Sequence, residues 1–311
     1  MDSIPVCFVE SLVRISRREE LQQLQHLSGH WRLSAEVQWR KSGRLELAYL
    51  PLNPNHWMFW YRIKGFDHLG TETLSREVLR EMSKSITSIE FLITEKLAVG
   101  RDWNIAPNRS DDVLQLIGRL DAPEKKLCVS AGSLEWHEKL FPKYAQLLKS
   151  FTSLRLESFP LFMMQFFKDM VATGRLRSIF FCEPIPAYQL YDMDFWVDYF
   201  LSESCTRLTA DFKDFAVVLE IIKRWKKADL HGFTASKVLR GIEASPEAFT
   251  GMGMKPMPMD LLGSDLLKLI ERKITGFWNI KSLHCIDHSE DPSGRIYVVF
   301  LGWGSCALLF Q

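Results

Sequence analysis

Seven short, apolar, strand-like phrases recur along the last two-thirds of the chain, and polar breaks and helix-like stretches separate them. Their central residues are Phe91, Leu127, Leu156, Ile179, Leu208, Leu230 and Leu283. Successive members are 36, 29, 23, 29, 22 and 53 residues apart, and the middle four spacings lie near the roughly 20–29 residues of a leucine-rich repeat. Residues 251–258, within the last interval, are rich in Gly, Met and Pro and predict a loop insertion.

Helical stretches with one apolar face fill the gaps between the phrases, at 161–171, 195–201, 215–225 and 261–270. A strand with a one-sided helix cannot bury its apolar surface alone, so such units stack on one another. We therefore predict an α/β fold, in which residues 67–311 form an irregular leucine-rich-repeat-like strand–helix solenoid. Residues 295–301 and 305–310 predict a C-terminal β-hairpin that closes it. An ordinary α/β domain is the main alternative.

The first third of the chain has a different organisation. Residues 1–35 predict a short helical segment, because Phe8, Leu12 and Ile15 and then Leu21 and Leu24 recur at helical spacing. From residue 36 apolar and polar residues alternate, which is typical of strands. We expect an antiparallel β-meander over residues 36–66, with its first strand at 36–40 and no third helix before it.

Charge and cysteine content limit the classes of partner and compartment. Lys+Arg number 39 and Asp+Glu 38, so no global field attracts nucleic acid or an acidic membrane. The run Lys223, Arg224, Lys226 and Lys227 is either a local basic patch or the solvated end of a helix. Six cysteines without a CxxC pair predict a reduced compartment, and no apolar run reaches the roughly 20 residues of a membrane span. We expect a cytoplasmic or nuclear protein.

Motifs for catalysis, cofactors and metals do not form complete sets. Gly251-Met252-Gly253-Met254 lacks the third glycine of a dinucleotide fingerprint. His284-Cys285-Ile286-Asp287-His288 offers metal-ligating side chains, but on a strand His284 and Cys285 point to opposite faces. The sequence therefore predicts no catalytic residue, no cofactor and no metal site, and a protein that is not an enzyme.

The N-terminal residues resemble a degenerate F-box. Ile4-Pro5 opens a helical stretch, a Leu-x-x-Leu helix follows, and Trp31 closes the segment. The layout of the whole chain, beginning with the phrase from Met1 to Phe8, is similar to the nematode family of F-box and F-box-associated (FTH-like) proteins. This resemblance implies a protein partner, the Skp-type subunit of a cullin–RING (SCF-type) ubiquitin ligase, and a second, target protein captured by the repeats. The matching contact residues would be Pro5, Phe8, Leu12, Ile15, Leu21, Leu24 and Trp31.

Three functions are compatible with these patterns. The first is a protein-interaction module that serves as a substrate adaptor in ubiquitin ligation. The second is an enzyme with an unrecognised active site in the repeats. The third is a nucleic-acid binder that uses Trp57, Trp60 and Tyr61 as a stacking platform beside Arg62 and Lys64, although aromatic residues that pack a small sheet explain the same pattern. We expect the first function.

Overall fold

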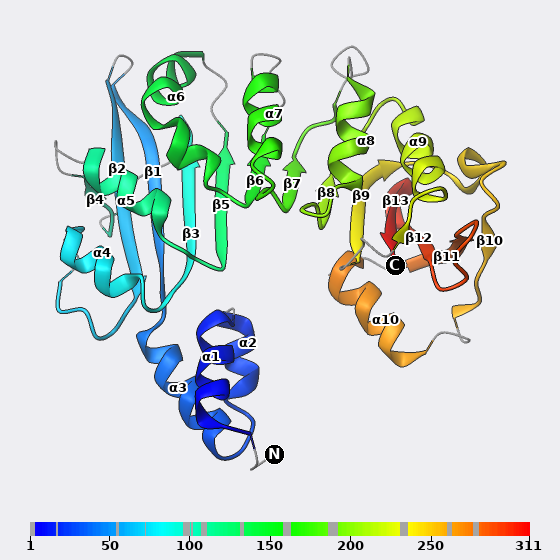
Figure 1. Cartoon of the computed structure of the whole chain (residues 1–311). Coiled ribbons are helices and arrows are strands. Elements are labelled where there is room, and N and C mark those ends of the chain that lie inside the picture. Colours follow the sequence, from blue (N-terminus) through cyan, green and yellow to red (C-terminus); the bar gives the residue numbers. More distant parts are fainter. Residues whose placement is uncertain are drawn as a thin grey trace. The chain divides into compact units, whose positions relative to one another are not determined.

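The computed structural model shows a mixed α/β protein (Figure 1). It describes residues 4–16, 18–53, 56–71, 73–95, 100, 102–106, 111–130, 134–157, 163–185, 192–230, 236–259, 263–275 and 280–311. The chain forms two compact units, Met1–Leu154 and Arg155–Gln311. Within the described residues, no helix is both long enough and apolar enough to cross a bilayer.

Unit 1 begins with three helices and continues into a sheet. The helices are α1 (Val6–Ile15), α2 (Arg18–Leu24) and α3 (His30–Lys41). The strands, in spatial order, are β4 (Asn104–Ile105), β2 (His56–Gly65), β1 (Gly43–Asn53), β3 (Ile86–Ile93) and β5 (Glu124–Val129). β2 pairs antiparallel with β1 and β4, whereas β1, β3 and β5 are parallel. The remaining helices are α4 (Arg76–Met82), α5 (Asp111–Arg119) and α6 (Leu134–Lys149).

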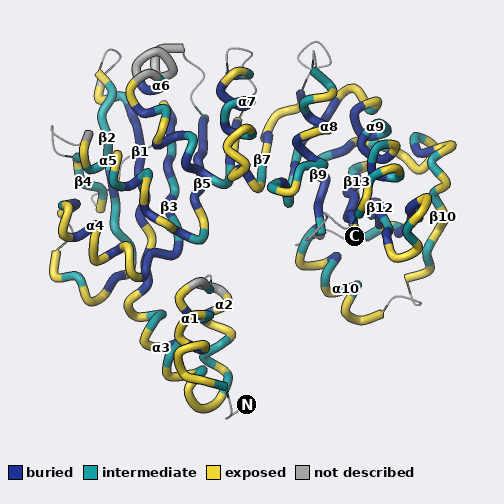
Figure 2. The backbone as a smooth tube through the Cα atoms, viewed as in Figure 1, coloured by how far each residue is buried: buried dark blue, intermediate teal, exposed yellow. Residues whose placement is uncertain are grey.

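Strand alternation gives the unit 1 sheet two different faces. Leu47, Phe91 and Leu127 are in register across β1, β3 and β5, and all three are buried. The ring of Phe59, on β2, lies 5.0 Å from that of Tyr144 on α6, so α6 covers this face. The row one residue earlier on each strand carries charged side chains instead. Figure 2 shows these strands largely buried while exposed residues follow the outer sides of the helices.

Unit 2 contains a sheet that changes from parallel to antiparallel. β6 (Ser153–Leu156) contains the boundary between the units. The other strands lie in the order β7 (Ser178–Phe181), β8 (Arg207–Thr209), β9 (Lys237–Glu243), β13 (Ser305–Phe310), β12 (Arg295–Leu301), β11 (Ile280–Asp287) and β10 (Lys255–Pro256). β7, β8 and β9 are parallel, and the pairs from β9 to β10 are antiparallel.

Helices cover both faces of the antiparallel part of this sheet. α7 (Met164–Ala172), α8 (Met193–Leu201) and α9 (Ala216–Trp225) follow β6, β7 and β8. Phe310 of β13 packs against Phe200 of α8 and Trp225 of α9, with ring centroids 4.9 and 5.8 Å away. On the opposite face, α10 (Ser264–Ile270) and the π-helical turn Glu271–Thr275 bury Ile270 and Ile274 against Val238 and its neighbours.

The mixed α/β class is confirmed, and several predicted elements have the predicted bounds. The phrases at 178–181, 295–301 and 305–310 are β7, β12 and β13. Helices lie at or close to the predicted positions 161–171, 195–201, 215–225 and 261–270. The parallel pairing of β1, β3 and β5 and of β7, β8 and β9 also agrees with stacked strand–helix units.

One predicted strand is wrong, and a second is absent at its central residue. Residues 36–40 belong to α3, so the antiparallel meander predicted over 36–66 consists only of β1 and β2. The helix forms because Trp31 and Ala35 are one turn apart and pack toward α1 and α2. The phrase predicted at 229–233 is not a strand at Leu230, and residues 231–235 lie outside the described residues. The strand that pairs with β8 is β9, at Lys237–Glu243.

Candidate partner-binding site

The three N-terminal helices enclose a small apolar core. Val9 and Val13 of α1 and Leu21 of α2 are at most 2% exposed. Around them pack Ile4, Leu24, Trp31 and Trp39, which are partly buried. α3 is therefore the third helix of this segment, which the alternation from residue 36 had not predicted.

Six of the seven residues predicted to contact a partner divide into two sets. Leu21 is fully buried, and Leu24 and Trp31 pack on the same core, so Leu21 holds the helices together and cannot touch a partner. Phe8 is 52% exposed, Pro5 caps the start of α1 at the surface, and Leu12 is half-buried. The side chain of Ile15 lies outside the described residues. Phe8, Pro5 and Leu12 are the members that remain available for contact.

A second apolar stripe lies on the outer side of α3 and was not predicted. Leu33 and Val37 are 62% and 53% exposed. They lie one turn apart from each other and about 200° around the helix from Trp31 and Ala35, because each residue advances a helix by about 100°. Apolar residues at every second position thus produce one buried and one exposed stripe. Over residues 36–40 the same alternation predicts a strand.

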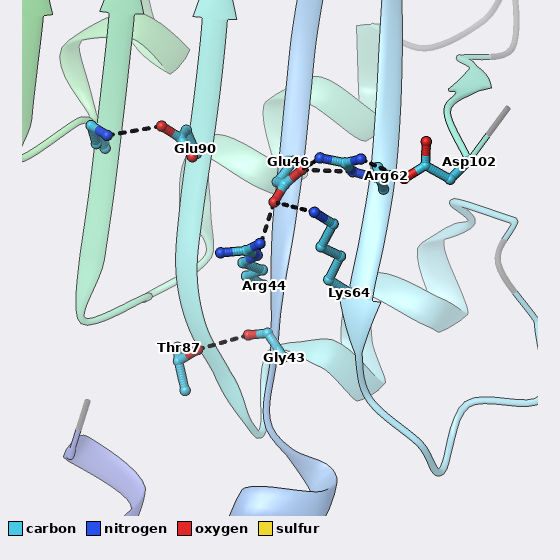
Figure 3. A network of polar contacts seen from close by, with 9 residues as sticks. Gly43, Arg44, Glu46, Arg62, Lys64, Thr87, Glu90 and Asp102 are labelled. Carbon is cyan, nitrogen blue, oxygen red and sulfur yellow. Dashed lines mark hydrogen bonds and ion pairs between the residues drawn. The ribbon is translucent and has the colours of Figure 1, made fainter. Parts of the chain in front are cut away.

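The end of α3 is fixed to the sheet by a compact junction. Ser42, between α3 and β1, accepts a hydrogen bond from Phe66 N–H, and Phe66 is buried with a positive φ of 59°. Gly43 lies under this ring, where a Cβ would overlap Phe66 and the Lys64 carbonyl. Thr87 Oγ1 donates to Gly43 O at 2.9 Å (Figure 3). These contacts join the helices to β1 and β3.

A charged row crosses the face of the unit 1 sheet opposite α6. Figure 3 shows the buried carboxylate of Glu46 paired with Arg44, Arg62 and Lys64. Burial lowers the pKa of Arg62, but hydrogen bonds to Asp102 and Glu46 outweigh that effect and leave the pKa raised. Farther along the row, Lys126 Nζ lies 2.9 Å from Glu90 Oε1. Each of these four cations contacts a carboxylate, but three of them share Glu46, so the row keeps one positive charge in excess.

The residues of the predicted stacking platform lie on two different faces of the sheet. Trp57 and Tyr61 share a face with Phe59: Trp57 stacks on Tyr49 at 5.2 Å, and Tyr61 Oη accepts a hydrogen bond from Leu74 N–H. Trp60, Arg62 and Lys64 are on the other face, because side chains alternate along β2. A row of bases could not stack on both sets, so the platform does not exist as predicted.

The basic run after residue 222 is not a free patch either. Arg224 pairs with Glu220, Asp198 and Asp194. Lys226 Nζ donates to Met252 O at 2.7 Å and thereby fixes the turn that follows residue 249. Lys223 remains exposed at the end of α9.

The side chains from His284 to His288 each make structural contacts, and they do not converge as metal ligands would. His284 and Cys285 are on opposite faces of β11, and Asp287 pairs with Lys255 and Arg295, which lower its pKa. His288 Nδ1 accepts hydrogen bonds from the N–H groups of Glu290 and Asp291, so its Nε2–H donates to Trp225 O at 2.8 Å. Over the described residues, no three His, Cys, Asp or Glu side chains are placed to hold a metal ion.

An open depression of about 480 Å³ lies beside the same turn in unit 2. Lys227, Asp229, Glu290 and Asp291 contribute charges of both signs to its lining. His288, which also lines it, has both ring nitrogens engaged by backbone groups. A nucleophile with an adjacent base, the arrangement that covalent catalysis requires, is not assembled by these lining residues.

No protein-family model matches this chain, and no curated protein matches it. Among the described residues, the exposed apolar side chains of α1 and α3 are the best candidate for a partner-binding site.

Proposed function

We propose that this chain is a protein-interaction module and acts as a substrate adaptor of a cullin–RING ubiquitin ligase. In this role the N-terminal helices bind the Skp-type subunit as a degenerate F-box, and the strand–helix units capture a target protein.

One observation carries the proposal: α3 has an apolar stripe on its outer side that its own fold does not bury. A helix in a small unit normally exposes polar residues opposite its core-facing stripe. Leu33 and Val37 are more than half exposed instead, and Phe8 on α1 is similarly exposed. Apolar side chains exposed by neighbouring helices are typical of a surface that a protein partner covers.

The strand–helix succession supports the second half of the proposal. β3 is followed by α5 after the short β4, and β5 and β7 lead into α6 and α8. We propose that these units form an irregular leucine-rich-repeat-like solenoid, an architecture whose stacked strands offer a broad surface to a protein. The second unit closes with the β12–β13 hairpin.

Capture of the Skp-type subunit by the tagged full-length chain tests this function. The Phe8→Asp variant places a charge at the proposed contact and should reduce capture by at least about tenfold, the loss typical of a central apolar contact. Ile105→Asp is the matched control, because Ile105 is 48% exposed on β4 and lies outside the helices. It should leave capture unchanged.

Two results would contradict the proposal. The first is wild-type protein that captures no Skp-type subunit. The second is an equal loss in Phe8→Asp and Ile105→Asp. Circular dichroism melting of each variant verifies that a loss of capture does not reflect unfolding.

A further inference from the structure

The segment around β10 in unit 2 is rich in methionine. Four of the 11 methionines of the chain lie within residues 252–259, namely Met252, Met254, Met257 and Met259. A thioether is a soft sulfur ligand that carries neither a charge nor a titratable proton, and soft sulfur ligands of this kind select Cu(I). Whether these side chains can act on one ion depends on the face of the sheet to which each one points.

The pairing of β10 with β11 defines the two faces. Pro256 is opposite His284, and Lys255 is opposite Cys285, in an antiparallel register (Figure 1). Directly opposite residues share a face, and so do residues two apart along a strand. Met254 comes two residues before Pro256 and therefore lies on the His284 face.

Met257 lies on the opposite face. Its N–H donates to Leu283 O at 2.9 Å, and its side chain packs on the buried apolar cluster that contains Ile270 of α10. Met259, two residues farther on, is 41% exposed. Met257 is therefore a packing residue that points away from His284.

His284 has a ring nitrogen without a hydrogen-bond partner. Its Nδ1 is buried, and no hydrogen bond to this atom occurs among the residues that the structure describes. The ring stands edge-on to Phe300, with the ring centroids 5.3 Å apart. Burial lowers the pKa of His284, which favours the neutral imidazole that binds metal ions. A buried polar atom of this kind costs free energy unless a ligand satisfies it.

Three side chains on this part of the segment are close enough to share one ion. Met254 and His284 are diagonal neighbours across the strand pair, which places them roughly 7 to 8 Å apart and within reach of long side chains. Only Gly253 separates Met252 from Met254, so the Cα atoms of the two methionines are at most roughly 7 Å apart. Methionine side chains are unbranched and flexible and can adapt to an ion. All three residues are half-buried, so an ion can reach them from solvent.

The charges around this face disfavour a divalent ion. Lys226 Nζ donates to Met252 O at 2.7 Å and brings a positive charge to the segment. Asp287, the carboxylate of β11, lies on the Cys285 face and pairs with Lys255. Hard divalent cations take oxygen ligands, whereas thioether and imidazole groups suit a soft ion. A monovalent ion held by neutral ligands is compatible with the nearby lysine.

We propose that Met252, Met254 and His284 form a binding site for Cu(I), with two thioether sulfurs and the imidazole as its ligands. Bound Cu(I) satisfies the ring nitrogen that the fold leaves without a partner and holds the segment before β10 against β11. The site lies in unit 2, and its ligands are separate from the N-terminal residues on which the adaptor function depends.

Competition for Cu(I) tests this site in the full-length chain. Exposed thiols also bind Cu(I), so the starting protein carries Cys7→Ser and Cys182→Ser. Cu(I) is supplied under nitrogen as its coloured bicinchoninate complex, with ascorbate as reductant, and loss of the colour measures transfer to the protein. Met254→Leu keeps the apolar volume but removes a sulfur, and it should weaken binding by at least about tenfold. His284→Phe should weaken binding by a similar factor.

Two control variants locate the site. Met257→Leu removes a thioether on the other face, and Cys285→Ala removes the neighbouring buried thiol. Both should bind Cu(I) within about twofold of the starting protein. A second measurement is the methyl NMR spectrum of methionine-labelled protein titrated with Ag(I), a soft ion of the same charge. The methyl signals of Met252 and Met254 should shift, and that of Met257 should not.

Three results would overturn the site. The first is no transfer of Cu(I) to the protein that lacks the exposed thiols. The second is an equal loss of affinity in Met254→Leu and Met257→Leu. The third is loss of binding in Cys285→Ala together with full binding in Met254→Leu, which would assign the ion to the thiol. Melting curves check that each variant is folded. Capture of the Skp-type subunit should be the same with and without Cu(I), so the failure of either proposal is distinguishable from the failure of the other.

Discussion

Lys237 is a charged residue that the fold removes almost entirely from solvent. It is 2% exposed at the start of β9, and its Nζ donates to Ser202 O at 2.5 Å and Cys205 O at 2.7 Å. Ser202 is the C-cap of α8, so the lysine satisfies a carbonyl that the helix cannot. Burial lowers the pKa of Lys237. Its hydrogen bonds to the two carbonyls hold the loop after α8 in position.

Replacement of this lysine should destabilise the chain. Lys237→Met keeps the length of the side chain but removes a donor from Cys205 O and one of two donors from Ser202 O, at a cost of roughly 1 to 3 kcal/mol. Lys223→Met is the control on the exposed end of α9 and should change stability by less than about 0.5 kcal/mol. Urea unfolding measures both. Equal midpoints for the two variants would refute the assigned role of Lys237.

Cys306 predicts a particular dependence of stability on pH. Burial raises the pKa of its thiol from 9.0 to about 12. Because the unfolded chain releases this proton first, the contribution is fully present below pH 9 and decreases as pH rises toward 12. Between pH 9 and pH 11 the wild type should lose roughly 2 to 3 kcal/mol more than Cys306→Ala. Unfolding free energies of both proteins over that range test the prediction, and parallel curves would contradict it.

At the scale of the element, α3 shows how one pattern can encode either structure. Apolar residues occupy every second position from Trp31 to Trp39, and over residues 36–40 this alternation predicts a strand. The segment is helical because one of the two stripes so created packs on Val9, Val13 and Leu21. That tertiary contact is not visible in local periodicity, and it decides the conformation.

Two leucines of the helical segment provide a matched test. Leu21 is fully buried and Leu33 is 62% exposed. Leu21→Ala should cost about 2 to 5 kcal/mol by creating a cavity, whereas Leu33→Ala should change stability by less than about 0.5 kcal/mol. In the capture assay the order should reverse, with Leu33→Ala weakening Skp-type binding in a fully folded protein. Retention of full binding by Leu33→Ala would remove α3 from the proposed contact.

Other elements show why sequence prediction succeeded or failed. β7, β12 and β13 were predicted with their observed bounds because each is a compact run of apolar residues between turn residues. β9 was missed because it begins at Lys237 and contains Gly241, at a positive φ of 84°. A charged first residue and an internal glycine both argue against a strand in the sequence. Only the structure shows the buried partners that allow the lysine to begin one.

The predicted contact residues of the N-terminal segment include both core and surface residues. Helical spacing identified Phe8 and Leu21 equally well, since spacing does not distinguish a core face from a contact face. Only packing shows that Leu21 is inside and Phe8 outside.

At the scale of the whole molecule, each compact unit contains cysteines whose reactivity shows whether that unit is folded. Cys7 in unit 1 and Cys182 in unit 2 are exposed. Cys128 is buried in unit 1, and Cys205 and Cys306 are buried in unit 2, where burial raises the pKa of Cys205 to about 11. A buried thiol with a raised pKa forms little thiolate. It therefore reacts slowly, because the thiolate is the nucleophile.

Cysteine labelling should therefore distinguish the units. In the native protein at pH 8, iodoacetamide should modify Cys7 and Cys182 and leave Cys205 and Cys306 protected. With increasing urea, Cys205 and Cys306 should become reactive together, at a midpoint different from that of Cys128, since compact units tend to unfold separately. Mass spectrometry of each peptide gives the midpoints. A single shared midpoint for all three would show one cooperative body.

The alternating sequence of α3 also has a consequence for misfolding. Only Ser42 separates α3 from β1, so residues 31–39 would extend β1 as a long amphipathic strand if they lost their helical partners. A strand of that length exposes unpaired backbone groups to other chains and promotes aggregation. We therefore expect α1 and α2 to protect the chain against aggregation during folding. Proteolytic loss of residues before 30 would yield insoluble protein.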